Sequence, residues 1–90
     1  MKFIIQESRL YGVFKKYMDS QYDLRYIDEG GKFVDKWGDM FGYIFDDHFY
    51  YISAKRQNEL YSLFGWGTSN ELLFYYLQKR FPDMKIDGVE

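Results

Sequence analysis

The stretch FGYIFDDHFYYIS, residues 41–53, decides the fold because it reads as two strands separated by a turn. Aromatic and β-branched residues, which favour strands, lie on both sides of Asp46 and Asp47. Aspartate favours tight turns because its carboxylate can hydrogen-bond to the nearby backbone. The pattern predicts a β-hairpin with strands at about 40–45 and 48–52.

A two-residue turn at Asp46 and Asp47 would fix the register of this hairpin and the side chains that share each face. One predicted face carries Phe41, Tyr43, Phe45, His48, Tyr50 and Ile52. The other carries Met40, Ile44, Phe49 and Tyr51, with Gly42 leaving room for the Tyr51 ring. Asp-Asp is a less favoured turn than Asn-Gly, which leaves open a longer loop and a shifted register. Both faces are apolar in either register, so both should be covered.

Before the hairpin, the apolar residues change from a helical to a strand period. Spacing of i, i+3, i+4 and i+7 predicts a helix at about 7–18, with a buried face made by Leu10, Val13, Phe14, Tyr17 and Met18. A short strand at 3–5 would lead into this helix. Residues 24–27 and 32–37 alternate as two strands around a turn at 28–31, where an aspartate and two glycines favour tight geometry.

After the hairpin, the sequence predicts two helices and a short strand. Ser53 can cap a helix at about 54–64, and residues 65–67 should end it. The apolar positions of this helix are Leu60, Tyr61, Leu63 and Phe64. Thr68 and Glu71 have the spacing of a capping box, which predicts a last helix from there to about Phe81, stopped by Pro82. Residues 84–89 read as a last strand.

Together these elements predict a single α+β domain covering residues 1–90. It has an N-terminal helix, an antiparallel four-strand meander, two C-terminal helices and a short last strand. Gly38 and Gly42 would allow the sheet to bend strongly into a partly barrel-like form. The alternative is a flatter sheet with the helices on one side.

The composition points to contact with another chain. Aromatic residues make up 23% of the 90 residues, which is more ring surface than so small a core is expected to enclose. We therefore expect a non-enzymatic, self-associating module, most simply a homodimer. The residues expected to make the contact are Phe41, Tyr43, Phe45, His48 and Tyr50. The chain has no cysteine, which excludes disulfides and fits a cytoplasmic setting.

His48 is the only histidine, and it follows the turn aspartates directly. A zinc site usually needs three or four ligands, and a general base needs a partner within hydrogen-bond reach in a pocket. The segment around Gly65 lacks the spacing and the lysine of a phosphate-binding loop. The sequence therefore predicts no enzyme activity, no metal and no cofactor. No apolar run approaches the roughly 18 residues that a membrane span needs.

Residues 41–44, FGYI, resemble the centre of the RNP1 motif of RNA-recognition domains, whose sheet aromatics stack on bases. The basic-glycine pair that leads this motif is replaced by Asp39 and Met40, and its final aromatic residue by Asp46. The net charge of −2 also disfavours a nucleic-acid partner. Nucleic-acid binding through Phe41, Tyr43 and Tyr50 is the alternative function.

Residues 4–10, IIQESRL, resemble the opening of small uncharacterised proteins from marine phage and metagenomic sequence. Those proteins begin with I-I-T-E-S-x-L, followed by a helix and a short aromatic β region. Gln6 stands where the family has a threonine that would cap the helix. The resemblance implies a viral or marine microbial origin and a cytoplasmic location, in the host cytoplasm if viral. It implies no activity.

Overall fold

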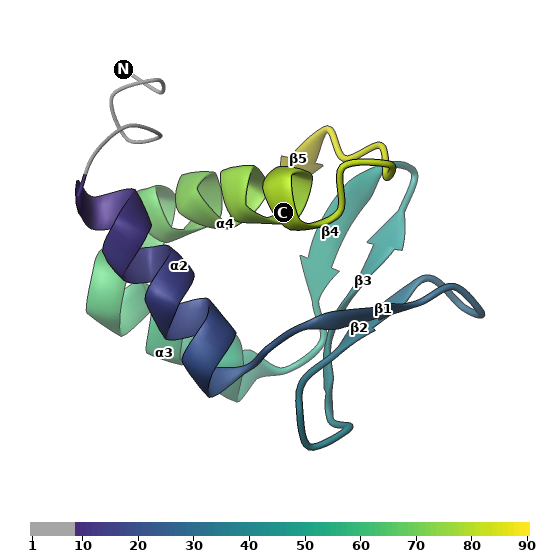
Figure 1. Ribbon diagram of the computed structural model, residues 1–90, viewed down its shortest axis with the longest axis horizontal. Helices are drawn as coiled ribbons and strands as arrows, with labels where there is room; N and C mark the ends of the chain where they lie inside the picture. The colour runs from purple at the N-terminus through teal and green to yellow at the C-terminus, as the bar shows by residue number, and fades with distance from the viewer. Residues whose placement is uncertain (1–8) are drawn as a thin grey trace.

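The computed structural model describes residues 9–90 as three helices and a five-stranded sheet (Figure 1). In chain order, the elements are α2 (Arg9–Gln21), β1 (Arg25–Ile27), β2 (Lys32–Val34), β3 (Met40–Phe45), β4 (His48–Tyr51), α3 (Ala54–Phe64), α4 (Trp66–Arg80) and β5 (Gly88–Val89). The predicted strand at 3–5, the helix start at 7 and most of the 4–10 motif lie outside the described residues. None of the helices in the described part is long and apolar enough to cross a membrane.

The sheet has the strand order β1-β2-β3-β4-β5, and its first four strands form the predicted antiparallel meander. The fifth strand runs parallel to β4 and contains two residues, far fewer than the predicted 84–89. β1 and β5 are opposite edges, so the sheet is open and does not close into a barrel. The three helices lie on one side of this sheet (Figure 1).

The hairpin turn forms as predicted at Asp46 and Asp47. Their φ angles are 53° and 64°, the left-handed geometry at both positions that a two-residue type I′ turn requires. The predicted register follows, with Phe45 opposite His48 and Tyr43 opposite Tyr50. The twist of this turn type matches the twist of paired strands, which explains why two aspartates adopt an uncommon backbone conformation here.

A β-bulge near the start of β3 corrects the predicted faces of Met40 and Phe41. Val34 pairs with Met40 and Phe33 pairs with Gly42, which leaves Phe41 as an extra residue in the strand. The bulge turns Phe41 into the core, where it is fully buried, and leaves Met40 exposed on the opposite face. Both residues therefore lie on the face opposite to the one predicted from strict alternation.

Gly42 leaves space for a ring, but for a different ring from the one predicted. A Cβ atom at Gly42 would lie 2.2 Å from Cζ of Phe49 and 2.7 Å from the carbonyl oxygen of Tyr50. The Phe49 ring therefore occupies the space that the sequence assigned to Tyr51. Tyr51 packs beside it, edge-on to the Phe49 ring.

The helix α2 buries Phe14 and Met18 as predicted, but Tyr11 takes the place expected for Leu10 and Val13. Tyr11, Phe14 and Met18 are buried, whereas Leu10 and Val13 are exposed. Phe14 packs edge-on against Tyr76 of α4 at a centroid distance of 6.1 Å. Aromatic rings bury more surface than valine or leucine, so turning the helix toward Tyr11 and Phe14 gains more burial.

The two C-terminal helices meet at a single glycine. Ser53 caps α3 as predicted, since its hydroxyl accepts a hydrogen bond from the Arg56 N–H. Gly65, at φ 87°, ends α3 and begins α4, so only one residue separates the helices. Thr68 and Glu71 then lie inside α4, and the predicted capping box is wrong. The positive φ of Gly65 makes the sharp change of direction possible three residues earlier than predicted.

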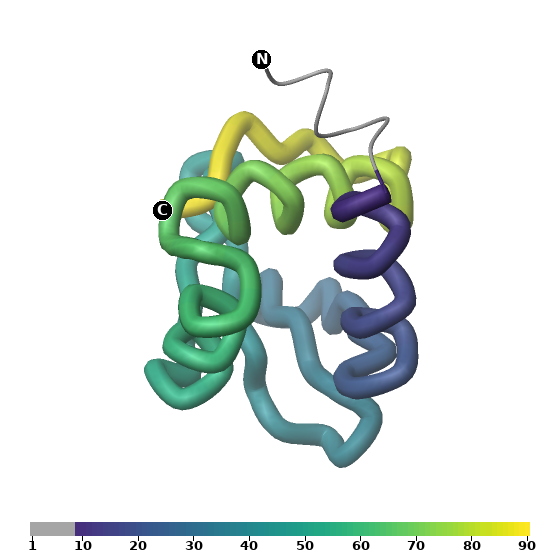
Figure 2. Tube along the Cα trace, turned by 90° about the vertical axis from the view of Figure 1, so that its left-hand side faces the viewer, coloured from purple at the N-terminus to yellow at the C-terminus, as the bar shows by residue number. Residues whose placement is uncertain are grey.

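The core lies between the sheet and the helices. Three sheet phenylalanines form its floor, namely Phe33, Phe41 and Phe49, and all are fully buried. Figure 2, viewed from the helical side, shows α2 and α3 standing apart with α4 above them. The α4 residues Leu72, Leu73 and Leu77 complete the core, and the helix ends at Arg80 before Pro82, as predicted.

Candidate interaction surface on the uncovered sheet face

The sheet face that points away from the helices is apolar at its centre. The strand pairing places Ile27, Lys32, Tyr43 and Tyr50 in one row across four strands. Phe45 and His48 form the next row, and Met40 lies in the row on the other side. We call this surface the outer face and define its apolar part by six residues, which are Ile27, Met40, Tyr43, Phe45, Tyr50 and Ile52.

The side chains of the outer face are open to solvent to an unusual degree. Phe45 is 66% exposed, and Ile27, Met40, Tyr43 and Ile52 are also exposed. The rings of Tyr43 and Tyr50 stack with a centroid distance of 5.3 Å and an angle of 18° between their planes. This cross-strand pair holds two flat aromatic surfaces in place at the centre of the face.

Four of the five residues predicted for the contact surface lie together on the outer face, namely Tyr43, Phe45, His48 and Tyr50. The fifth, Phe41, belongs to the core because of the bulge. Sequence reasoning missed Ile27 and Met40. The alternation of residues 24–27 could have placed Ile27 on this face. The position of Met40 depends on a bulge that the sequence does not mark.

His48 lies beside the carboxylate of Glu90 at the edge of the outer face. Its Nδ1 lies 2.9 Å from Oε2 of Glu90, close enough for an ion pair when the imidazole is protonated, although not aligned as a hydrogen bond. No group of three or more histidine, aspartate or glutamate side chains in this part of the chain could hold a metal ion. The contact leaves a carboxylate at the β4–β5 edge of the outer face.

Charge is distributed unevenly across the outer face. Arg25 of β1 and Lys32 of β2 place two cations toward one edge of the sheet. At the other edge, Glu90 follows β5 and is anchored by a hydrogen bond from its N–H to the Phe49 carbonyl oxygen. An apolar centre thus separates Arg25 and Lys32 from Glu90.

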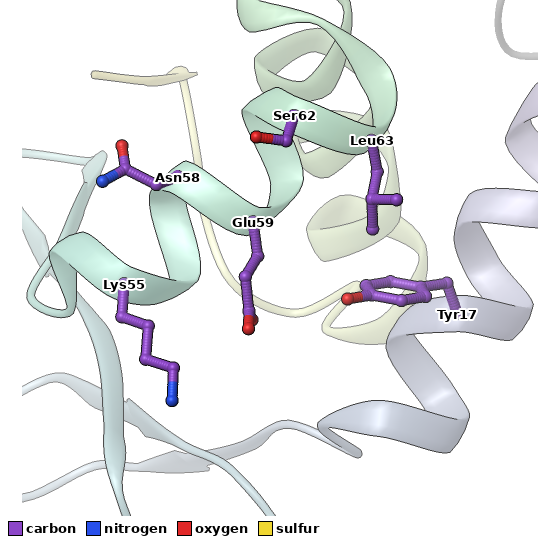
Figure 3. A pocket seen from close by; sticks show the side chains of 6 residues that line it. All are labelled: Tyr17, Lys55, Asn58, Glu59, Ser62 and Leu63. Carbon is purple, nitrogen blue, oxygen red and sulfur yellow. The ribbon is translucent and has the colours of Figure 1, made fainter.

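A groove of about 730 Å³ lies between α2 and α3, on the helical side of the molecule (Figure 3). Tyr17 of α2 forms one wall, and Figure 3 shows the Glu59 carboxylate of α3 projecting into the opening. Glu59 accepts a 2.8 Å hydrogen bond from the Tyr22 hydroxyl and lies 3.5 Å from Arg56. Burial is the main cause that raises the pKa of Tyr22, and its contacts with Tyr17 and Glu59 add to it. Glu59 therefore holds α3 to the loop after α2, a structural role.

The outer face is the surface that departs most from an ordinary solvent-facing sheet, because it is apolar where polar residues are usual. Its rings are pre-positioned by strand pairing and need no rearrangement to meet a partner. Comparisons with protein-family models, curated proteins and solved structures each give no match to the chain, so the outer face is interpreted from its own chemistry.

Proposed function

We propose that this protein is a non-enzymatic interaction module that self-associates as a dimer through its outer face. The observation that carries the proposal is the contiguous set of exposed apolar side chains around Phe45 and the Tyr43–Tyr50 stack. Contiguous apolar surface of this kind is typical of interaction sites in soluble proteins. Burying it against a second sheet face would give the two-layer packing found in β-sandwiches.

A second copy of the chain fits this face because the charge pattern is complementary to itself. A two-fold axis parallel to the strands would place β1 and β2 of one copy over β4 and β5 of the other. Arg25 and Lys32 would then face Glu90 of the partner, twice in each dimer. Charges at the rim of an apolar interface favour the correct orientation and speed the encounter.

The size of the sheet sets the expected strength of the dimer. The five strands contain 3, 3, 6, 4 and 2 residues, so at about 3.3 Å per residue and about 4.8 Å between strands the sheet projects to roughly 300 Å² on each partner. A standard stable interface buries about 800 Å² on each side. We therefore expect a weak dimer, with a dissociation constant of about 10 µM to 1 mM.

Sedimentation equilibrium over about 10 µM to 1 mM tests the proposal. The wild-type chain should shift from its monomer mass of 11.0 kDa toward twice that mass. Phe45→Glu, which adds a charge to the most exposed ring of the face, should remain a monomer. Leu63→Glu is the matched control, because Leu63 is similarly exposed but belongs to α3 on the helical side. A wild-type monomer at every concentration would reject the dimer.

Charge exchange tests the orientation of the two copies. Lys32→Glu should weaken the dimer, because two carboxylates would then face each other at each edge. Combining it with Glu90→Lys should restore association, since the pair is then reversed. If both single variants dimerise as well as the wild type, the strand-parallel two-fold arrangement is wrong.

Nucleic-acid binding is the second candidate function, and one observation favours it. Lys32 lies in the same row as the stacked Tyr43 and Tyr50, and a cation beside aromatic rings is a common platform for single-stranded nucleic acid. Against it, Phe41 of the RNP1-like segment is buried and the net charge is −2. A gel shift with single-stranded RNA and DNA at low and high salt separates the functions. Salt-sensitive binding that Tyr43→Ala abolishes would favour the second one.

A further inference from the structure

A cavity of about 470 Å³ lies away from the outer face, between the β1–β2 turn and the segment that follows α4. Its walls are Tyr26, Phe81, Pro82 and Met84, with the side chains of Asp28 and Asp83 also lining it. The volume is within the range of small-molecule sites, which is about 300–1,000 Å³. Its lining thus combines aromatic and apolar walls with two carboxylates.

The aromatic walls are held in place by the core. Tyr26 and Phe81 both pack against the buried Phe33 ring, with centroid distances of 5.1 Å and 5.2 Å. The turn after α4 is closed by a hydrogen bond from the Met84 N–H to the Phe81 carbonyl oxygen. The rings and the apolar side chains beside them are therefore positioned before any ligand arrives.

The charge inside the cavity is negative. Within residues 9–90, the carboxylates of Asp28 and Asp83 form no ion pair and no side-chain hydrogen bond. Arg80 also lines the cavity, but its guanidinium is neutralised by Asp19 at 3.2 Å and Asp23 at 2.8 Å. A ligand in the cavity would thus meet two carboxylates that lack a cation.

We propose that this cavity binds an organic cation of the quaternary or methylated ammonium class. Aromatic rings attract such cations through their quadrupoles, and the methyl groups suit the apolar surfaces of Pro82 and Met84. A primary ammonium is more strongly hydrated and loses more on entering an apolar cavity. Arg80 already lies 5.9 Å from the Phe81 ring, so the ligand cation is placed nearer Tyr26 and the two aspartates.

Nuclear magnetic resonance titration with choline and its neutral isostere 3,3-dimethyl-1-butanol tests the proposal. The two molecules have the same shape and differ in charge. Choline should shift the Tyr26 and Phe81 resonances saturably in the millimolar range, and the alcohol should bind about tenfold more weakly, the ratio that corresponds to about 1.4 kcal/mol. Equal binding of the two molecules, or no saturable shift with choline, would overturn the proposal.

Variants of the exposed aspartates locate the charge that selects the cation. Asp28→Asn and Asp83→Asn should each weaken choline binding by about threefold to tenfold. Glu29→Gln is the matched control, because it removes one negative charge from the same turn without altering the lining. Equal affinities for all three variants and the wild type would contradict a site in this cavity, and circular dichroism spectra would verify folding.

The same chemistry occurs in free choline, in trimethyl-lysine of proteins and in phosphatidylcholine headgroups. Titrations with choline, with a trimethyl-lysine peptide and its unmethylated form, and with phosphatidylcholine vesicles distinguish these sources. Preference for the methylated peptide over the unmethylated one supports the class and identifies a protein ligand. Vesicle binding that free choline inhibits identifies the lipid source. Binding of the unmethylated peptide alone would contradict the class.

The outer face takes no part in these assays, so they are independent of dimer formation.

Discussion

The two faces of the β3–β4 hairpin have similar apolar content and opposite surroundings. On the inner face, Phe41 and Phe49 are fully buried beneath the helices. On the outer face, Phe45 and Tyr43 lie exposed in the same two strands. The difference shows that the packing of the rest of the chain, and not the apolar pattern of the strands, determines which face is covered.

Local backbone features select the covered face. The bulge at Phe41 adds a third phenylalanine to the inner face, and Gly42 provides the space in which the Phe49 ring lies. Together with Phe33, these rings form a dense aromatic floor on which the helices pack. The inner floor has a cost, since the Tyr51 hydroxyl is buried there without a hydrogen-bond partner among residues 9–90, and this burial raises its pKa.

The largest expected effect is a difference in folding stability between a substitution on the inner face and one on the outer face. Phe49→Ala leaves a cavity in the aromatic floor and should lower the free energy of unfolding by about 3–5 kcal/mol. Phe45→Ala removes a mostly exposed ring and should change it by no more than about 0.5 kcal/mol. Urea denaturation at low protein concentration, where the chain is monomeric, measures both. Equal losses would mean that Phe45 is covered within the monomer.

The next effect tests the space at Gly42. Gly42→Ala places a methyl group against the Phe49 ring and the Tyr50 carbonyl oxygen, and should lower the free energy of unfolding by about 2–3 kcal/mol. Gly12→Ala is the control, because Gly12 lies in α2 with no atom within 4 Å of the added methyl. It should raise stability by about 0.5–1 kcal/mol through helix propensity. A neutral Gly42→Ala variant would show that the inner face is loosely packed.

The turn between β3 and β4 offers a smaller effect, which should be a gain in folding stability. Replacing Asp46 by Asn and Asp47 by Gly gives the pair that type I′ turns prefer, at two positions where φ is positive. We expect a gain of about 0.5–1 kcal/mol in thermal or urea unfolding, with the register unchanged. A loss of stability would indicate that the two aspartate carboxylates stabilise the turn more than the strained backbone destabilises it.

Much of the fold could be predicted from the sequence, because its signals are local. The hairpin turn, the Ser53 cap and the stop at Pro82 each depend on residues a few positions apart. The errors arise where tertiary packing competes with a local pattern. At Phe41 a bulge overrides strict alternation, and at Gly65 a one-residue junction overrides the capping box.

The candidate sites also divide into residues marked by local sequence signals and residues brought together by tertiary packing. Tyr43, Phe45, His48 and Tyr50 were predictable because they belong to one hairpin with a well-marked turn. The cavity beside Tyr26 and Phe81 was not, because its walls come from segments more than fifty residues apart. No local pattern reports that both of those rings pack against Phe33.

The smallest expected effect concerns the polar contact at the edge of the outer face. Glu90→Gln removes the charge opposite His48, and both side chains are at least one-third exposed. Solvent screens such pairs, so the free energy of unfolding should change by less than about 0.5 kcal/mol. If the proposed dimer forms, the same change should raise its dissociation constant by about threefold, because Glu90 would also lose its contact with the partner's basic edge. Unfolding and sedimentation measured on one sample separate the two roles. A loss of folding stability above about 1 kcal/mol would mean that Glu90 serves the monomer, by fastening β5 to β4, and would remove it from the interface.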